Sequence, residues 1–136
     1  MARKRRPAQP TAAELEILEV LWDAGPSTVR QVHDTFKRRR RSRTGYTTVL
    51  KLMQIMAQKG LLSRDESRRS HVYSPTGSRE KTRRGIVADL IERAFAGSTS
   101  QLVLSALSAK RASDKELAAI REMLSRQADG ARESGS

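Results

Sequence analysis

The chain has 136 residues, which suffice for one ordinary domain with its own core, or for a small domain followed by an extension. Its 27 Lys and Arg residues outnumber the 15 Asp and Glu residues, and the net charge of +12 favours a polyanion or an anionic membrane surface as partner. Cysteine is absent, which excludes disulfides, thiolate metal sites and a cysteine nucleophile.

No apolar run approaches the roughly 20 residues that a membrane-spanning helix needs, and the basic start MARKRRPAQP is not followed by the apolar segment of a signal peptide. His33 and His71 have no neighbours at metal-ligand spacing, and the sequence contains no acid–base pair, nucleophile constellation or glycine-rich phosphate loop. We therefore expect a cytoplasmic protein that inserts in no membrane, holds no metal or cofactor and is not an enzyme.

The N-terminal residues divide into an arm and a helix. Residues 1–10 are basic and contain proline, so we expect a disordered arm. Thr11 and Glu14 have the spacing of a capping box, which predicts that a helix with an apolar stripe begins here. This helix should end at Ala24, because Gly25-Pro26 stops it.

A second helix is predicted over residues 28–39, with Ser27 as its N-cap. It continues into the segment KRRRRSR (37–43), in which six of the seven residues are cations. These cations repel one another unless an anion lies nearby, but charge runs are also common in solvated, mobile loops. The sequence leaves both interpretations of this run open.

A third helix is predicted from Tyr46 to Lys59-Gly60, and a hairpin follows it. The inward face of the helix is expected to consist of Val49, Leu52, Met53 and Met56. The segments LLSRD and SHVYSP have β character around the polar turn ESRR, and Pro75 ends the second segment. The opposite, polar side of the helix needs a partner outside the core.

Three short helices followed by a small antiparallel hairpin have the order of a winged helix-turn-helix domain, in which the third helix reads DNA. The outward side chains that can reach base edges in a major groove are Thr47, Thr48, Lys51 and Gln54. Arg68 and Arg69 at the hairpin tip are then expected over phosphates or a minor groove. Further contacts to the DNA backbone are expected from Ser27, Arg30, Arg41, Arg43 and Tyr46. The alternative for Thr47 and Thr48 is a β-branched first turn that contacts only solvent.

The charges are distributed unevenly between the two parts of the chain. Residues 1–75 hold 16 basic and 7 acidic residues, a net charge of +9. Residues 76–136 hold 11 basic and 8 acidic residues, a net charge of +3. Positive charge is therefore concentrated in the predicted DNA-reading part, as neutralisation of phosphates requires.

The second part of the chain is predicted to be helical again. Apolar residues recur at helical spacing from Ser78 to about Ala96, in SQLVLSALSAK and in KELAAIREMLSRQ. Ser113 and Glu116 have the spacing of a capping box at the start of the last of these helices. The sequence thus predicts a winged-helix domain over 11–77, a helical region over 78–128 and a tail over 129–136 that is disordered by composition.

These C-terminal helices are too small to enclose a core, because about 50 residues are near the lower limit for independent folding. A second copy of the chain would give a twofold dimer whose two reading heads match a palindromic site. Packing back on the winged helix is the alternative. The residues expected in the dimer contact are Ile86, Leu90, Ile91, Phe95, Leu102, Val103, Leu107, Leu117, Ile120 and Leu124.

Several segments together resemble one known family. They are TAAELEILEVLWDAGPSTVRQVHDTF, GYTTVLKLMQIMAQKGLLSRD, HVYSP and the late SQLVLSAL with SDKELAAIREML. In this order, from about Thr11 to Arg126, they closely resemble the penicillinase-repressor (BlaI/MecI) family of bacterial transcriptional regulators. The combination of the Leu-Trp-acidic end of the first helix, the Tyr-Thr-Thr-Val start of the third and the later LVL segment is specific.

The resemblance implies a homodimeric winged-helix repressor that occupies a dyad operator over a promoter, with the C-terminal helices as the dimer module. It places the base-reading positions on Thr47, Thr48, Leu50, Lys51 and Gln54, and the wing on Arg68 and Arg69. It also implies a membrane sensor with a metalloprotease domain as a further partner. In the best-known members, cleavage in the dimerisation segment ends repression.

Two departures from the family concern this release of repression. Where some members are cut at an Asn-Phe bond, this chain has Ser105-Ala106, the candidate cleavage segment, and a protease that selects a bulky aromatic finds only a methyl group there. Copper-responsive relatives have a C-terminal cysteine pair, and its absence here excludes metal sensing by that route.

The sequence therefore predicts a mostly α-helical protein, with an N-terminal winged helix-turn-helix and a helical dimerisation region. The predicted function is that of a homodimeric, sequence-specific repressor that binds double-stranded palindromic operator DNA. The alternative is a basic protein that coats nucleic acid without sequence preference, as a nucleoid- or RNA-associated factor would. That alternative lacks the stacking aromatics of single-strand binders, since the chain has five aromatic residues and most fit core positions.

Overall fold

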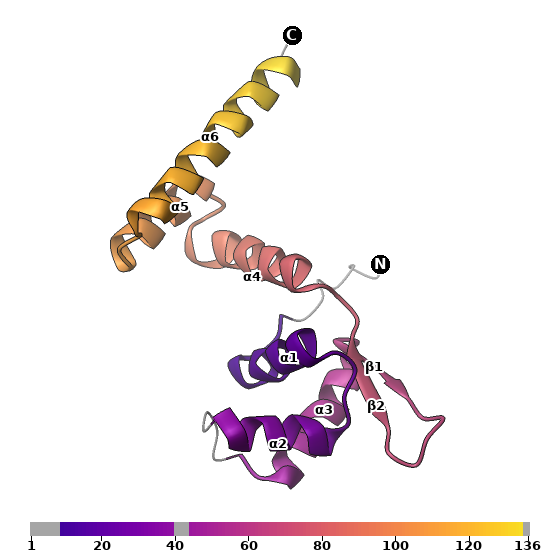
Figure 1. The fold of residues 1–136 in the computed structure, drawn as a ribbon. Helices are drawn as coiled ribbons and strands as arrows, with labels where there is room; N and C mark the ends of the chain where they lie inside the picture. The colour runs from indigo at the N-terminus through magenta and orange to yellow at the C-terminus, as the bar shows by residue number, and fades with distance from the viewer. Residues whose placement is uncertain (1–8, 40–43, 135–136) are drawn as a thin grey trace. The chain divides into compact units, whose positions relative to one another are not determined.

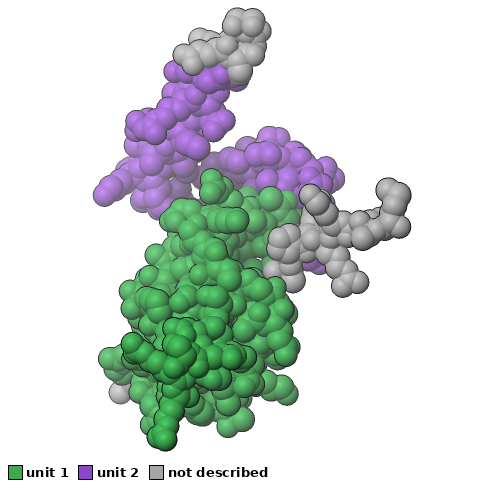
Figure 2. Space-filling model, turned by 90° about the vertical axis from the view of Figure 1, so that its right-hand side faces the viewer, with its two compact units in different colours: residues 1–89 green, residues 90–136 purple. Residues whose placement is uncertain are grey.

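The computed structural model describes residues 9–39 and 44–134. The elements in chain order are α1 (Ala12–Ala24), α2 (Val29–Arg39), α3 (Tyr46–Gln58), β1 (Leu62–Asp65), β2 (Val72–Pro75), α4 (Arg79–Ala94), α5 (Thr99–Ala109) and α6 (Asp114–Ser134). The chain divides into two compact units, Met1–Asp89 and Leu90–Ser136, which we call the head unit and the C-terminal unit (Figure 2). The expected succession of three helices, a hairpin and three further helices is confirmed (Figure 1).

Helix α1 begins and ends as its sequence predicts. The Thr11 N–H donates to Glu14 Oε1 at 2.9 Å, and the Glu14 N–H donates to Thr11 Oγ1 at 3.2 Å, so the capping box is confirmed. At the other end Gly25 has a φ of 85°, and its N–H donates to the Leu21 carbonyl at 2.8 Å. A positive φ of this size favours glycine, which explains why the helix stops there.

The N-cap of α2 is Thr28, and the expectation that Ser27 has this role is wrong. Thr28 and Gln31 form a capping box, with N–H to side-chain oxygen distances of 2.8 and 3.2 Å. Ser27 is buried instead, its hydroxyl donates to the Gly25 carbonyl at 2.8 Å, and its backbone pairs with Tyr73 of β2. The bridge to a distant strand holds Ser27 in extended backbone, so the cap moves one residue along the chain.

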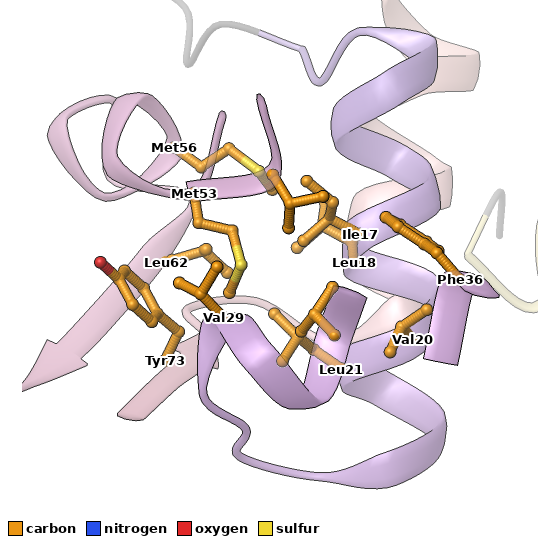
Figure 3. Packing of buried hydrophobic residues seen from close by; sticks show 12 residues of the cluster. Ile17, Leu18, Val20, Leu21, Val29, Phe36, Met53, Met56, Leu62 and Tyr73 are labelled. Atoms are coloured by element: carbon orange, nitrogen blue, oxygen red, sulfur yellow. The ribbon is translucent and has the colours of Figure 1, made fainter. Parts of the chain in front are cut away.

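One apolar core joins the three N-terminal helices to the hairpin (Figure 3). Its buried members are Ile17, Leu18, Val20, Leu21, Val29, Val32, Phe36, Val49, Met53, Met56, Leu62 and Tyr73. Figure 3 shows side chains from α1, α2, α3 and both strands directed toward one another. Of the four residues expected on the inward face of α3, Leu52 is only half-buried, whereas the other three are fully buried. Each large side chain buried in this way stabilises the fold by about 1.5–3 kcal/mol.

The hairpin is tied to the helices at both of its ends. In the antiparallel register Leu62 pairs with Pro75 and Arg64 pairs with Tyr73. The Tyr73 N–H donates to the Ser27 carbonyl at 2.9 Å, and the Thr76 hydroxyl donates to the Gly60 carbonyl at 2.7 Å. These bonds fix the hairpin beside α3, where a wing is required.

A buried ion pair links the start of α1 to the end of α3. Glu14 is 1% exposed, and the Lys59 ammonium lies 2.9 Å from its Oε2. Burial by itself raises the pKa of Glu14, but the Thr11 N–H and the Lys59 ammonium outweigh it, so the pKa of this carboxyl lies below its usual value. The cation of Lys59 is also favourable at the C-terminus of α3.

The expected N-terminal arm and C-terminal tail each differ from the structure at one point. Residues 1–8 of the arm lie outside the described residues, whereas Gln9 packs against α4, where a Cβ at Gly85 would lie 3.3 Å from the Gln9 Oε1. Helix α6 continues to Ser134, so the expectation of a disordered tail from residue 129 is wrong as far as residue 134. A single interior glycine costs a helix only about 1 kcal/mol, and Ala128 and Ala131, which lie near Gly130, are strong helix formers.

Helices α4, α5 and α6 contain no buried side chain among the residues whose exposure is described. The capping box at the start of α6 is confirmed, because the Ser113 N–H donates to Glu116 Oε1 and the Glu116 N–H to Ser113 Oγ, both at 3.1 Å. None of the described helices combines the length and the apolar character that crossing a membrane requires.

Candidate nucleic-acid interface

The outer face of α3 presents polar side chains to solvent. Thr47, Thr48, Lys51 and Gln54 are all exposed, while Val49 and Met53 of the same helix are fully buried. The N-cap residue, Gly45, has no side chain with which to bond the first N–H groups of α3. Free N–H groups at a helix N-terminus attract anions such as phosphate. These four polar residues therefore have the exposure that contact with DNA demands.

Leu50 differs from the other four expected base-reading residues. It is half-buried and packs against the core, so it does not belong to the exposed polar face. Its side chain also lines a groove beside that face. Ser27, expected among the contacts to the DNA backbone, is 5% exposed and its hydroxyl already has a partner. Leu50 is apolar and Ser27 is buried, so neither adds an exposed polar group to this surface.

A groove of about 350 Å³ lies between the start of α2, the outer side of α3 and the hairpin. We call it the basic groove. The polar or charged residues that line it include Arg30, Tyr46, Gln54, Arg64, Arg69 and His71. Three arginines, from α2, β1 and the turn of the hairpin, thus line the groove beside the polar face of α3. A concave surface lined by cations raises the local concentration of anions such as a phosphate backbone.

Arg64 is a residue of this groove that reasoning from the sequence did not single out. It pairs with Glu66, and its guanidinium also bonds to the Tyr73 hydroxyl. The bond to Tyr73 and then the pair with Glu66 raise the pKa of Arg64 above its usual value. The alternation of side chains along a two-stranded hairpin was the available signal, since Arg64 is the cross-strand partner of Tyr73.

Two of the expected backbone-contacting residues, Tyr46 and Arg30, line the basic groove. Tyr46, at the first position of α3, is 42% exposed and its ring lies edge-on to His33 of α2, with centroids 5.9 Å apart. Arg30 is exposed on α2 and reaches the basic groove. Arg41 and Arg43 lie outside the described residues.

Arg68 and Arg69, which the sequence assigned the same role at the hairpin tip, lie in different places in the structure. Arg69 lines the basic groove, whereas Arg68 is exposed and is not among the residues of that groove. The Ser67 N–H donates to Asp65 Oδ1 at 2.9 Å, which shapes the turn. The bonds from Ser67, with Arg68 nearby, hold the pKa of Asp65 below its usual value.

The residues expected in the dimer contact are placed on α4, α5 and α6. Leu90, Val103, Leu107 and Leu124 are exposed, and the other six are half-buried. Three further apolar side chains that were not expected there are also exposed, namely Val87, Leu104 and Met123. Ser105 and Ala106 are exposed in α5.

In the described part of the chain, no three His, Asp or Glu side chains come close enough together to hold a metal ion. His33 is half-buried against Tyr46, and His71 belongs to the basic groove. Both histidines lie in the head unit.

Comparison with known proteins assigns the chain to a family. Residues 10–126 match the model of the penicillinase repressor family. The chain belongs to this family. The resemblance seen in the sequence is confirmed, and its relatives are transcriptional regulators rather than enzymes.

Two curated relatives are each named "Transcriptional regulator BlaI" and come from the CDC 1551 / Oshkosh and ATCC 25618 / H37Rv strains of Mycobacterium tuberculosis. Each is 33% identical to this chain over 92 residues, which cover 67% of this chain and 65% of the relative. The match thus spans less than two thirds of the length of these relatives.

Two solved structures are also similar to this chain. One is the solution structure of the DNA-binding domain of the repressor BlaI, with a TM-score of 0.48. The other is that of the Bacillus licheniformis BlaI monomeric form in complex with the blaP half-operator, with a TM-score of 0.47. Each is 23% identical and covers 55% of this chain and 89% of the solved chain.

Proposed function

We propose that this chain is a transcriptional repressor that binds double-stranded operator DNA through the outer face of α3. The observation that carries the proposal is the exposed polar face of α3 beside the basic groove, in a chain that belongs to the penicillinase repressor family. A helix with one side fully buried and the other side polar has the form of a recognition helix.

The proposed base contacts come from Thr47, Thr48, Lys51 and Gln54. Lysine reaches guanine O6 and N7, glutamine bonds to the edge of adenine, and a threonine methyl can contact the methyl of thymine. Leu50 lies beside these residues, but it packs against the core. This packing supports a role in attaching α3 to the core rather than in reading bases. Each good bidentate contact discriminates by about 1–3 kcal/mol.

The proposed phosphate contacts come from the arginines of the basic groove and from the hairpin tip. Arg30, Arg64 and Arg69 approach the groove from α2, β1 and the turn, and Arg68 extends the positive surface beyond it. Phosphate contacts fix the register of a protein on the duplex and make its affinity fall with salt, but they carry no sequence information.

We further propose that the chain acts as a homodimer on a palindromic operator. The support is the set of exposed apolar side chains on α5 and α6, which include Leu104 at 60%, Met123 at 55% and Leu124 at 59%. Exposed apolar residues at this density favour a partner surface, and closed twofold symmetry is the commonest way to provide one. Two linked heads bind far more tightly than one, so weakening the dimer releases the operator.

The candidate cleavage segment, whose cutting would end repression, lies in one of these helices. Ser105 and Ala106 lie in the interior of α5, where the backbone is hydrogen-bonded in a helix rather than extended. Neither residue offers the bulky side chain that a protease selective for an aromatic residue needs. If a membrane sensor with a protease domain is a partner, we expect it to act on this chain by a route other than this bond.

The second candidate function is the coating of nucleic acid by charge alone, which the net charge of +12 supports. A binding competition separates the two functions. The protein selects duplexes from a random library, and unlabelled random duplex then competes against the selected sequence. A repressor retains the selected duplex against a large excess of competitor, whereas a coating protein loses it in proportion to the total DNA.

The reading face is tested with two variants of one residue type on one helix. Gln54→Ala removes a proposed base contact, and Gln58→Ala removes an exposed glutamine one turn further along α3. We expect Gln54→Ala to reduce the preference for the selected duplex by about tenfold, and Gln58→Ala to leave it unchanged. Equal effects of the two substitutions would rule out the proposed orientation of α3 on DNA.

A further inference from the structure

Two carboxylates on the outer side of α1 receive arginine side chains from two other helices of the head unit. We call Glu19 and Asp23 the α1 acid pair. The Arg79 guanidinium lies at the first position of α4, and its Nη2 is 3.1 Å from Glu19 Oε2 and 2.6 Å from Asp23 Oδ1. From the end of α2, Arg39 Nη2 lies 3.7 Å from Asp23 Oδ2. Arg79 is therefore the one of these arginines that touches both carboxylates.

Trp22 completes this set of contacts from the same turn of α1. The Arg79 guanidinium carbon lies 5.5 Å from the centroid of the Trp22 ring, within the range of a cation–π interaction. The Trp22 Nε1–H donates to the Gly77 carbonyl at 3.0 Å, two residues before α4 begins. The chain that leads from the hairpin into α4 is thus held to α1 at Gly77 and again at Arg79.

The place of Arg79 is not explained by the stability of α4 itself. A cation in the first turn of a helix is unfavourable beside the positive end of the helix dipole. In addition, Arg79 Nε is buried and has no hydrogen-bond partner among the described residues. The bond to Asp23 and the charge of Glu19 raise the pKa of Arg79, and the bond to Arg79 lowers the pKa of Asp23. The contacts with α1 therefore outweigh two features that oppose this arrangement.

A second arginine of α4 also lies near Glu19, and this second contact constrains the direction of α4 relative to α1. Arg83, one turn after Arg79, has its Nη2 3.7 Å from Glu19 Oε1. Two points one turn apart on α4 are thus attracted to the same side of α1, and two points constrain the direction of a helix as well as its position. Helix α4 continues without interruption to Ala94, and the residues proposed for dimerisation lie on α4 and on the helices that follow it.

We propose that Arg79 is a positioning residue for operator recognition, which fixes the direction in which α4 leaves the head and so sets the half-site spacing that a dimer accepts. This inference rests on the proposed function, because spacing has meaning only for a dimer on two half-sites. It goes beyond that function because it assigns the spacing preference to the contact between Arg79 and the α1 acid pair. This contact involves neither the DNA nor the apolar faces of α5 and α6. A dimer whose heads are held in one orientation tolerates one spacing, whereas loosely held heads adapt to several.

The experiment uses the full chain and a duplex selected by it from a random library. The distance between the half-sites of this duplex is then changed one base pair at a time, up to half a helical turn of about 5 bp. The measured quantity is the ratio of the Kd at altered spacing to the Kd at the selected spacing. A duplex that contains a single half-site reports separately on the head.

Two variants change the net charge in opposite directions while they remove the same contact. Arg79→Gln removes one positive charge, and the double variant Glu19→Gln with Asp23→Asn removes two negative charges. We expect both variants to lower the ratio of the Kd at altered spacing to the Kd at the selected spacing by about tenfold. The Kd of the single half-site should stay within about twofold of the wild-type value. Arg84→Gln is the control, because it removes the same charge from an exposed position of α4.

The outcomes separate this inference from the proposed function. If the wild-type chain has a spacing preference and both variants keep it, the positioning role of Arg79 is wrong while the function stands. If the two variants shift the ratio in opposite directions, charge rather than positioning is responsible, and the inference is also overturned. If the wild-type chain accepts every spacing equally, both the dimeric function and the inference fail.

Discussion

In the head unit, residues as distant along the chain as Ile17 and Tyr73 are both buried in one core, whereas α5 contains no buried residue and exposes Leu104 and Leu107. Both units are built from amphipathic helices, and they differ in whether an apolar side finds a partner within the described chain. The head unit closes on itself, because a hairpin and three helices surround a common centre. This contrast shows that regular secondary structure does not by itself provide a core. The following experiments test the contrast, from the largest expected effect to the smallest.

The largest effect is expected from opening the core of the head unit. Met53 is fully buried, and Met53→Ala removes atoms from the centre of the cluster shown in Figure 3. We expect the free energy of unfolding to fall by about 2–5 kcal/mol, measured by urea denaturation. A loss below about 1 kcal/mol would mean that the three helices and the hairpin do not share one core.

A smaller loss is expected when Glu14 loses its partner. Lys59→Met leaves a buried carboxylate without its cation, and we expect a loss of about 1–3 kcal/mol, below the full value for a buried pair because Lys59 is partly exposed. The double variant Lys59→Met with Glu14→Gln has no unpaired carboxylate at this position. It should therefore recover part of the lost free energy of unfolding. A double variant less stable than Lys59→Met alone would show that the unpaired carboxylate of Glu14 is not the cause of the loss.

The same carboxyl makes the head unit sensitive to acid. The pKa of Glu14 is lower in the folded chain than its usual value, so the unfolded chain takes up a proton at higher pH than the folded chain does. The stabilisation by this group is therefore complete above the unfolded pKa and is lost as the pH falls through the folded pKa. We expect a shallower acid-induced loss of stability in Glu14→Gln than in the wild-type chain, measured as urea midpoints over a pH series. Parallel pH curves would assign the acid sensitivity to other carboxyls.

The smallest effect on the stability of the head is expected from the C-terminal unit. Leu104 is 60% exposed, so Leu104→Glu should change the unfolding of the head by less than about 0.5 kcal/mol. Its effect on self-association should be large, because a charge in an apolar contact opposes dimerisation. Sedimentation measures the association, and Gln101→Glu, an exposed polar position on α5, is the control. An unchanged dimer would remove Leu104 from the proposed contact.

Much of the candidate site followed from local pattern, and its exceptions have a common origin. The alternation of buried and exposed residues on α3 placed Thr47, Lys51 and Gln54 correctly on the exposed side. Leu50 and Ser27 were assigned to DNA contacts although the structure buries them in part or in full. The Ser27 backbone bonds to Tyr73 of the distant strand β2, and Leu50 packs against the core cluster, and neither contact is apparent from a local pattern.

The sequence by itself determined where α1 begins and ends and where α6 begins, because capping boxes and glycine stops act within four residues along the chain. It also determined which side of α1 and α3 is apolar, and where the positive charge is concentrated. Only the tertiary structure decided that Arg64 enters the basic groove, that Lys59 neutralises Glu14 and that Arg79 holds the α1 acid pair. The last two contacts join residues 45 and 56 positions apart, and such pairs form only when the folded core brings their helices together.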